Sequence, residues 1–392
     1  MKTINNYNFN KKNVLLLVDF NVPVKNNIIL DNIRIVKVIP TINKILNDKP
    51  NKIIVITHLG RPNGKKIKKL SLEIVSIELS KLLKKNVFFY KKDIMKFNDN
   101  ELKKIKNKII LLENIRFYKE EKNKDIKLAI KLKKISDIFV NDAFAASHRD
   151  VCSNMIIPTL FKYKCIGYLM DKEIKDMEKI FNKPKKPILA IIGGGKVSTK
   201  IGLIKYITKY IDYLILGGCI SYTFLKYQGY NIGNSCVDDK YVNTIPEIIK
   251  HCKKNNVKLF LPDDFIVCKK KKIKKVNYFN IPNNYSGVDI GEKSIKKFSK
   301  IILKSRTIFF NGPFGLIEVK KFSYGTLKII KYIGMSSKKY KSYSVIGGGE
   351  SLLTLKKYKH KNRISVISTG GGAMLYILKG KKFPFIKKKV II

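Results

Sequence analysis

The chain alternates short apolar runs with segments of helical periodicity. In one helical segment Leu72, Val75, Leu79 and Leu82 recur on one face, and Ser71 precedes them as the expected cap. The apolar runs lack the alternation of half-exposed strands, which indicates strands buried on both faces of parallel sheets. We therefore predict an α/β fold. The predicted strands are residues 14–20, 52–58, 108–113, 137–144, 188–192, 213–216, 259–261, 307–310, 344–346 and 364–367.

These strands fall into two groups joined by one segment. Residues 167–181 have the pattern of a single helix, and the "NKPKKP" that follows is typical of a connector. A length of 392 residues is enough for about two or three domains. We predict an N-terminal domain of residues 1–166, an interdomain helix of residues 167–182 and a C-terminal domain of residues 183–372.

Nothing readable in the sequence directs the chain out of the cytoplasm. Residues 1–13 are polar and Asp19 interrupts the next apolar run, so no signal peptide is expected. The longest apolar stretch, residues 214–225, is too short to span a bilayer. The six cysteines form no Cys-x-x-Cys pair, which indicates neither a disulfide framework nor a zinc site. We expect a soluble cytoplasmic protein with reduced cysteines and no membrane association.

The formal net charge is +52. Clustered cations would favour a nucleic-acid partner, because they release counterions from a phosphate backbone. The lysines are dispersed, however, and runs such as 65–69, 253–254, 269–275 and 387–389 are expected in loops or on polar helix faces. We interpret the charge as a compositional bias towards lysine and expect no specific nucleic-acid partner.

Arginine and glycine are distributed unevenly against this background. The chain has six arginines, and Arg34, Arg61, Arg116 and Arg149 all precede residue 150. In a lysine-rich chain, an arginine indicates a need for the planar fork that grips carboxylate or phosphate. Of the 24 glycines, 21 follow residue 190, mostly at strand ends. The first half therefore suits a small anion, and the second half suits a nucleotide against bare backbone.

The stretch "IIGGGKVSTK", residues 191–200, can be compared with two known phosphate-binding motifs. A P-loop requires Ser or Thr after Gly-Lys, where Val197 stands, and a glycine at the position of Ala190. A dinucleotide fingerprint requires a glycine at the position of Ser198. Both patterns fail, which disfavours a dinucleotide-dependent dehydrogenase. An unnamed phosphate loop and an ordinary strand-to-helix turn both remain open from this stretch alone.

Nine motifs together carry a family resemblance: "VDFNVP", "THLGRP", "ENIRF", "NDAFAASHR", "GYLMDKEI", "GGGKVSTKIGLI", "NGPFGLIE", "GGGES" and "STGGGA". In these residues and their order, from about residue 14 to 385, the chain resembles phosphoglycerate kinases. The resemblance implies two Rossmann-like domains of three αβα layers, hinged about the central helix, with residues 373–392 packing back onto the first domain. It also implies reversible phosphoryl transfer from 1,3-bisphosphoglycerate to ADP, giving 3-phosphoglycerate and ATP, by a monomer.

The resemblance assigns the site residues by position. The implied triose site is Asp19, Asn21, Arg34, His58, Leu59, Gly60, Arg61, Arg116 and Arg149. The implied nucleotide site is Lys200, Asn311, Glu318, Gly347, Gly348, Gly349, Glu350 and Ser351. Arg34, Lys196, Gly348 and Gly371 are expected around the transferred phosphoryl group.

Glu350 is the departure from the family pattern, because the family usually has aspartate there. The carboxylate would hold the Mg²⁺ of the nucleotide, and Mg²⁺ demands near-ideal octahedral geometry. We expect activity to survive and metal affinity to change. The acceptor is a carboxylate that is ionised at neutral pH, so no general base is needed. Asp19 is accordingly expected to orient the substrate or Arg34. A catalytically inactive relative would have lost motif residues, and only Glu350 deviates.

Overall fold

The computed structural model describes residues 1–180, 182, 184–356, 358 and 361–386. Contacts between Cα atoms divide this chain into two compact units. Unit 1 comprises Met1–Lys175 with the described residues that follow Lys381, and unit 2 comprises Asp176–Lys381. The division falls inside helix α8, Tyr168–Glu178, which occupies most of the predicted interdomain helix.

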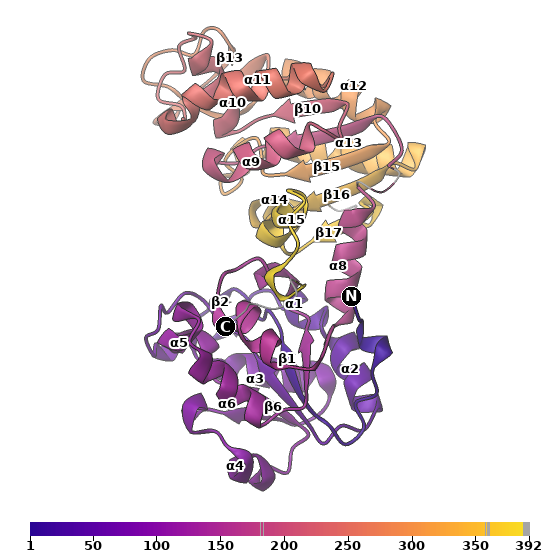
Figure 1. Ribbon diagram of the computed structural model, residues 1–392. Coiled ribbons are helices and arrows are strands. Elements are labelled where there is room, and N and C mark those ends of the chain that lie inside the picture. Colours follow the sequence, from indigo (N-terminus) through magenta and orange to yellow (C-terminus); the bar gives the residue numbers. More distant parts are fainter. Residues whose placement is uncertain (181, 183, 357, 359–360, 387–392) are drawn as a thin grey trace. The chain divides into compact units, whose positions relative to one another are not determined.

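The central sheet of unit 1 has six parallel strands in the order β5-β6-β4-β1-β7-β8. Figure 1 labels β1 and β6 of this sheet. Four of the six strands match predicted apolar runs. The two edge strands were not predicted: β5 is a run of only four apolar residues with Phe88 exposed, and Lys164 interrupts β8. The bounds are β1 Asn13–Leu17, β4 Lys52–Ile56, β5 Val87–Tyr90, β6 Ile109–Leu112, β7 Ile138–Asn141 and β8 Tyr163–Ile166, with a small hairpin of β2 Val24–Lys25 and β3 Ile28–Ile29.

Both faces of this sheet are buried, as the continuous apolar runs predict. Leu16 and Val55 are register partners on one face and share a core with α2 and α3. Leu15 and Ile54 are partners on the other face and share a core with α6. Fully burying each such side chain stabilises the fold by about 1.5–3 kcal/mol. The helices are α1 Ile33–Val36, α2 Ile39–Asn47, α3 Glu73–Leu83, α4 Asp99–Lys104, α5 Lys119–Asn123, α6 Ile126–Lys134 and α7 Cys152–Met155.

Helix α3 forms on the predicted face, but its predicted cap is wrong. Val75 and Leu79 are fully buried. The N-cap residue is Leu72, and the Ser71 hydroxyl, one residue earlier, accepts from the Glu73 amide at 3.4 Å and donates to Glu113 Oε2 at 2.7 Å. The Leu72 amide donates to Glu113 Oε1 at 2.9 Å, so a carboxylate from a distant loop satisfies the start of the helix.

The sheet of unit 2 also has six parallel strands, in the order β11-β10-β9-β15-β16-β17. Leu189 and Ile191 of β9 pack in a core with Phe298 of α12 and Ile329 of α13. The α/β class with mainly parallel sheets is confirmed. The strands are β9 Ile188–Ile192, β10 Tyr213–Leu216, β11 Lys258–Phe260, β15 Thr307–Asn311, β16 Tyr343–Gly347 and β17 Val366–Ser368, and the helices are α9 Val197–Ile207, α10 Cys219–Tyr227, α11 Ile245–Lys254, α12 Glu292–Lys304, α13 Tyr324–Tyr340, α14 Gly349–Lys356 and α15 Gly371–Ile377.

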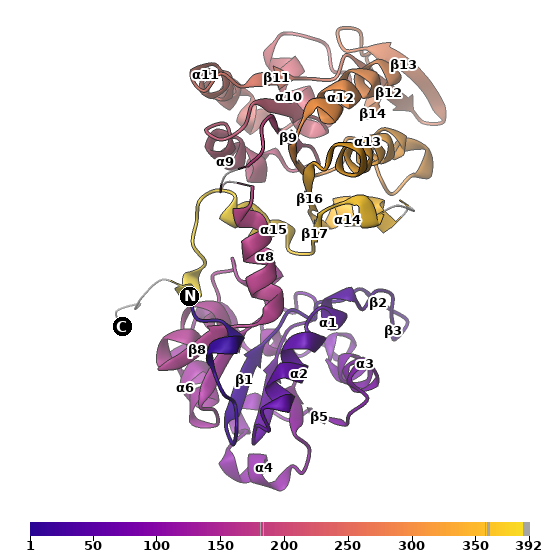
Figure 2. The same ribbon diagram turned by 90° about the vertical axis from the view of Figure 1, so that its right-hand side faces the viewer.

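Unit 2 carries an antiparallel sheet that was not predicted, with strand order β13-β12-β14 (Figure 2). The strands are β12 Asp264–Lys269, β13 Lys272–Asn277 and β14 Ser286–Ile290. The expectation that lysines 269–275 lie in a loop or on a helix is therefore wrong. Lys270 adopts a left-handed φ of 53° in the turn, and the exposed β13 keeps its lysines in solvent. Lysines 387–389 lie outside the described residues.

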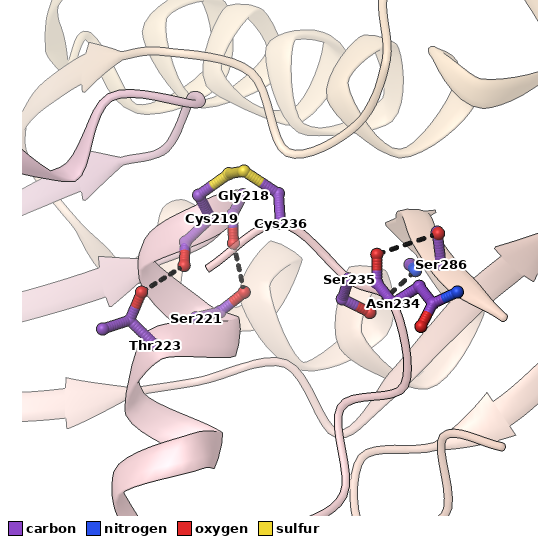
Figure 3. Close-up of a disulfide and its surroundings, with 9 residues drawn as sticks. Gly218, Cys219, Ser221, Thr223, Asn234, Ser235, Cys236 and Ser286 are labelled. Atoms are coloured by element: carbon purple, nitrogen blue, oxygen red, sulfur yellow. Dashed lines mark hydrogen bonds between the residues drawn. A yellow bond between two sulfur atoms is a disulfide. The ribbon is translucent and has the colours of Figure 1, made fainter. Parts of the chain in front are cut away.

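The expectation that the cysteines are all reduced is also wrong. Cys219 and Cys236 form a disulfide with a Cα–Cα distance of 5.1 Å, and Figure 3 shows it linking the start of α10 to the loop beyond that helix. The sequence spacing of 17 residues matches no known motif, so only the folding back of the chain reveals the pair. Cys152, Cys165, Cys252 and Cys268 are free thiols. Among the described helices, none combines the length and apolar character needed to cross a bilayer.

Candidate active site

The carboxyl ends of adjacent strands in unit 1 present the predicted triose residues. Strands β6, β4, β1 and β7 are consecutive in the sheet, so their ends meet along one edge. This edge is where ligands bind in open parallel sheets. The residues follow the strands in turn: Asp19 and Asn21 after β1, His58, Leu59, Gly60 and Arg61 after β4, Arg116 after β6, and Arg149 after β7.

A hydrogen-bonded network connects the loops after β1 and β4 with α1. Arg34 Nη1, from α1, donates to Asp19 Oδ1 at 2.8 Å. The same oxygen accepts from the Asn21 amide at 3.0 Å and lies 3.8 Å from His58 Nε2. The Asn21 side chain accepts from the Gly60 amide at 2.8 Å. These bonds hold the acidic and basic groups in defined orientations before any ligand binds.

The remaining arginines surround a cavity of about 420 Å³ lined by Arg61, Arg116 and Arg149. Arg116 Nη1 donates to the Gly60 carbonyl at 2.7 Å, which joins the loops after β6 and β4. Arg149 Nε is buried and has no hydrogen-bond partner in the part of the chain that the structure describes. A buried guanidinium nitrogen without a partner is costly, and an anion in the cavity would remove that cost. Leu59 is different from these residues, because its side chain is 3% exposed and belongs to the core.

The electrostatics of this cluster favour an anionic ligand. Burial, together with the charges of Arg116, Arg149 and Arg34, lowers the pKa of His58 to about 3, although the charge of Asp19 acts in the opposite direction. Burial and the charge of Arg149 lower the pKa of Arg116 to about 10. His58 is thus neutral at pH 7 while the arginines stay charged and repel one another. A ligand bearing two negative groups would relieve this repulsion.

Asp19 is the anion that partly balances the cluster. Burial alone would raise the pKa of Asp19, but the surrounding charges outweigh burial and hold the pKa below its usual value. Because His58 is neutral at pH 7, we assign this lowering to the ion pair with Arg34. Asp19 therefore accepts hydrogen bonds at neutral pH and is a poor proton acceptor.

Glu121, which sequence reasoning missed, lines the same cavity. Its carboxylate is 3% exposed and accepts from the Ser153 amide at 2.9 Å and from the Ser153 hydroxyl at 2.6 Å. Burial raises the pKa of Glu121 to about 7, although the bonds from Ser153 act in the opposite direction. The signal was present in "ENIRFYKEE", because acidic residues beside Arg116 stand out in a chain with so few of them.

In unit 2, contacts join several predicted nucleotide residues at the ends of β15 and β16. Lys200 Nζ, from α9, donates to Asn311 Oδ1. Asn311 Nδ2 donates to the Gly347 carbonyl at 2.9 Å. The Gly312 amide donates to Ser351 Oγ at 3.0 Å, which fixes the start of α14 beside β15. These contacts leave backbone amides at helix starts near the strand ends, where phosphate groups bind.

The two glycine loops after β16 and β17 lie against each other. Gly348 has a φ of +101°, a conformation that residues with a Cβ rarely adopt. A Cβ on Gly371 would lie 2.6 Å from the Gly348 Cα. The backbone conformation therefore favours glycine at position 348 and packing requires it at position 371, and the predicted pair Gly348 and Gly371 is brought together.

The other predicted residues of unit 2 are less tightly connected. Lys196 is the exposed N-cap residue of α9, and its ammonium group has no hydrogen bond or ion pair among the described residues. Glu318 is exposed and lines a separate cavity of about 160 Å³. Gly349 begins α14, and the side chain of Glu350 lies outside the described part of the chain. Within the described ranges, no group of three or more His, Cys, Asp or Glu side chains could hold a metal.

Comparison with known proteins decides the family. A family profile described as "Phosphoglycerate kinase" matches residues 4–381. The phosphoglycerate kinase of Finegoldia magna is 38% identical over 392 residues, covering 98% of both chains. The solved structure of phosphoglycerate kinase from Coxiella burnetii is 35% identical with a TM-score of 0.85, covering 98% of this chain and 97% of that one. The structure from Pyrococcus horikoshii is 28% identical with a TM-score of 0.85, covering 98% of both.

The chain belongs to the phosphoglycerate kinase family. Membership confirms the resemblance seen in the nine motifs and makes the chain a phosphotransferase enzyme of glycolysis. It also rules out the dehydrogenase that the missing dinucleotide fingerprint disfavoured. The role of each residue in the family's reaction stays a prediction that the geometry above supports to different degrees.

Proposed function

We propose that the arginine cluster of unit 1 binds 3-phosphoglycerate or 1,3-bisphosphoglycerate, and that the glycine loops of unit 2 bind ATP or ADP. One observation supports this most strongly. Arg34, Arg61, Arg116 and Arg149 come from separate segments and converge around a single edge of the sheet, where Asp19 pairs with Arg34. Such a cluster suits a three-carbon acid with an anion at each end.

Within this site, Arg34 has the central role in the transfer step. Its guanidinium is oriented by Asp19 at 2.8 Å, and we propose that it also contacts the migrating phosphoryl group. The charge on the equatorial oxygens spreads in the transition state, and a cation already in place stabilises it without reorganisation. Arg61, Arg116 and Arg149 hold the opposite end of the triose in their cavity.

No residue needs to remove a proton from the acceptor. The substrate carboxylate is ionised at neutral pH, because carboxyl pKa values lie near 4. Neutral His58 can donate one hydrogen bond to the substrate, and ionised Asp19 holds Arg34 in place. The protein therefore positions the reacting groups and neutralises charge, which is what phosphoryl transfer requires.

The nucleotide would lie along the ends of β15 and β16. Lys200 and Asn311 would contact the phosphates, the loop 347–351 would cover them with its amides, and Glu318 would accept bonds from the ribose hydroxyls. Lys196, Gly348 and Gly371 would surround the transferred group. Glu350 would supply a carboxylate to Mg²⁺, and its oxygen atoms are the type of ligand that Mg²⁺ prefers. When bound, Mg²⁺ neutralises charge on the nucleotide phosphates.

Three broader features belong to the same proposal. The division between the two units lies inside α8, and we infer that this helix contains a hinge. Closure about the hinge would bring the two ligands in line and exclude water. The enzyme would act as a cytoplasmic monomer. Its charge of +52 would draw anionic metabolites towards it without specificity for nucleic acid.

A coupled assay tests the function. The purified chain is given ATP, Mg²⁺ and 3-phosphoglycerate, and formation of 1,3-bisphosphoglycerate is followed through its reduction with NADH by a coupling dehydrogenase. We expect NADH loss that requires all three components and stops when 3-phosphoglycerate is omitted. No turnover with the folded chain, or equal turnover without 3-phosphoglycerate, would contradict the proposal.

A further inference from the structure

We propose that the Cys219–Cys236 disulfide is a redox modification site, which a dithiol reductant opens and whose opening weakens nucleotide binding. The inference rests on the proposed nucleotide site in unit 2. It concerns a part of that unit to which the transfer mechanism gives no role.

The disulfide forms part of a cavity wall. Cys219 and Cys236 both line the cavity of about 160 Å³ that Glu318 also lines. Gly194 and Gly218 lie on the same wall, and the Cys219 amide donates to the Gly194 carbonyl at 3.2 Å. A cavity bordered by glycine backbone and one carboxylate suits the nucleoside part of a nucleotide. A change at the disulfide is therefore a change in the shape of this cavity.

The loop that carries Cys236 is attached on two sides. On the β14 side, the Gly287 amide donates to Ser235 Oγ at 2.9 Å, and Ser286 Oγ donates to the Asn234 carbonyl at 2.9 Å (Figure 3). On the α10 side, the disulfide joins the loop covalently to the first residue of the helix. Opening the disulfide leaves the β14 attachments and the Lys226–Asp239 ion pair in place. It removes the covalent link between Cys236 and the first residue of α10, so the cavity wall at Cys236 loses order.

The two sulfurs differ in a way that permits directed exchange. Cys236 is exposed, whereas Cys219 is 5% exposed. An incoming thiolate therefore reaches the Cys236 sulfur first. Cys219 is the first residue of the nine-residue helix α10, and a helix N-terminus stabilises a thiolate. Cys219 is accordingly the better leaving group, and exchange is fastest when the leaving thiol is the more acidic one.

The reaction balances with a dithiol as its partner. One thiolate of the dithiol attacks Cys236 Sγ, the Cys219–Cys236 bond breaks, and Cys219 leaves as a thiolate. The second thiolate of the dithiol then attacks the first dithiol sulfur, which is bonded to Cys236 Sγ in the mixed disulfide. The Cys236 thiolate is released. Two electrons pass to the protein disulfide, the dithiol ends as a disulfide, and protons from solvent neutralise the released thiolates according to their pKa values.

The expected cellular location favours a regulatory role over a structural one. Disulfides in cytoplasmic proteins are rare, and those that occur usually take part in catalysis or redox sensing. The exposed Cys236 beside a ligand cavity is consistent with a disulfide that takes part in redox sensing. The other four cysteines are unpaired, so the disulfide does not belong to a wider framework.

The test compares the intact enzyme in two redox states. One sample is equilibrated with oxidised glutathione and the other with dithiothreitol, and both are denatured and alkylated before mass spectrometry. We expect labels on Cys152, Cys165, Cys252 and Cys268 in the oxidised sample and on all six cysteines in the reduced one. In steady-state assays, reduction should raise KM for ATP about five-fold, the cost of one disordered loop contact. KM for 3-phosphoglycerate should not change.

Two variants complete the design. Cys236→Ser should show the higher KM for ATP under both conditions, and Cys268→Ser, a matched change at a free thiol, should behave as wild type. Six labels after oxidation, or equal KM values for ATP in the two states, would overturn the inference. Absence of turnover in both states would instead count against the proposed function. Calorimetric titration with ADP then decides the inference, because tighter binding to the oxidised chain supports it and equal binding refutes it.

Discussion

Replacing Arg34 with lysine keeps the charge but removes the planar fork. Arg34 Nη1 donates to Asp19 Oδ1 at 2.8 Å, and the side chain is 28% exposed, so it reaches both the buried aspartate and the site edge. A guanidinium has five donors and can contact Asp19 and a phosphoryl oxygen together. A lysine ammonium is a compact point charge and lacks the planar fork that spans both partners.

The expected loss follows from the contact that lysine cannot make. A hydrogen bond between charged groups contributes about 1.5–3 kcal/mol. If the missing bond forms mainly in the transition state, kcat/KM for Arg34→Lys falls by about 10- to 150-fold. Most of the fall should appear in kcat, because an interaction made only in the transition state leaves KM nearly unchanged.

The coupled assay measures this directly at saturating ATP and varied 3-phosphoglycerate. The matched control is Arg306→Lys in unit 2, where the guanidinium donates to the Leu303 carbonyl at 3.2 Å and the Lys304 carbonyl at 3.0 Å. We expect wild-type kcat for this control and unchanged thermal unfolding for both variants. Wild-type turnover in Arg34→Lys would refute the argument that the fork is required.

Three further outcomes follow from the structure. Gly371→Ala should lower kcat about ten-fold, because its Cβ would lie 2.6 Å from the Gly348 Cα and displace the loop; an unchanged kcat would show that the loops can separate freely. The folded pKa of Glu121 is raised from 4.5 to about 7, so its contribution to stability is complete below pH 4.5 and is lost as the pH rises through about 7. In urea unfolding, the free energy of unfolding of Glu121→Gln should therefore decline with rising pH by up to about 3 kcal/mol less than that of the wild type. An identical pH dependence of the two proteins would argue against the raised pKa of Glu121. Glu350→Asp should shift the Mg²⁺ concentration for half-maximal rate, which a metal titration measures, and an unaltered dependence would contradict the expectation that the longer side chain changes metal affinity.

The central strands could be predicted because burial on both faces leaves a clear pattern. β9 and β15 consist of fully buried residues in continuous runs, and both were expected within a residue of their bounds. β5 and the β12–β14 sheet could not be predicted in the same way. β5 has the exposed Phe88, and β13 is exposed along most of its length and rich in lysine, so neighbouring strands rather than local pattern decide their structure.

The site could be predicted where it contains residue types that are rare in this chain. Arginines are rare in this lysine-rich chain, so four of them in distinct contexts indicated the anion site before its geometry was known. Glu121 was not found, because a glutamate in a short helix is usually solvated, and only the tertiary fold buries it beside Ser153. The Cys219–Cys236 pair depends in the same way on the fold, since neither cysteine has a motif around it.

The central claim is that the triose binds to unit 1 and the nucleotide binds to unit 2. A crystal structure of the enzyme with 3-phosphoglycerate and ADP tests it most directly. The account predicts the triose against Arg34, Arg61, Arg116 and Arg149, and the nucleotide against Lys200 and the loop 347–351. Both ligands in the same unit, or the four guanidinium groups directed away from the bound triose, would contradict it.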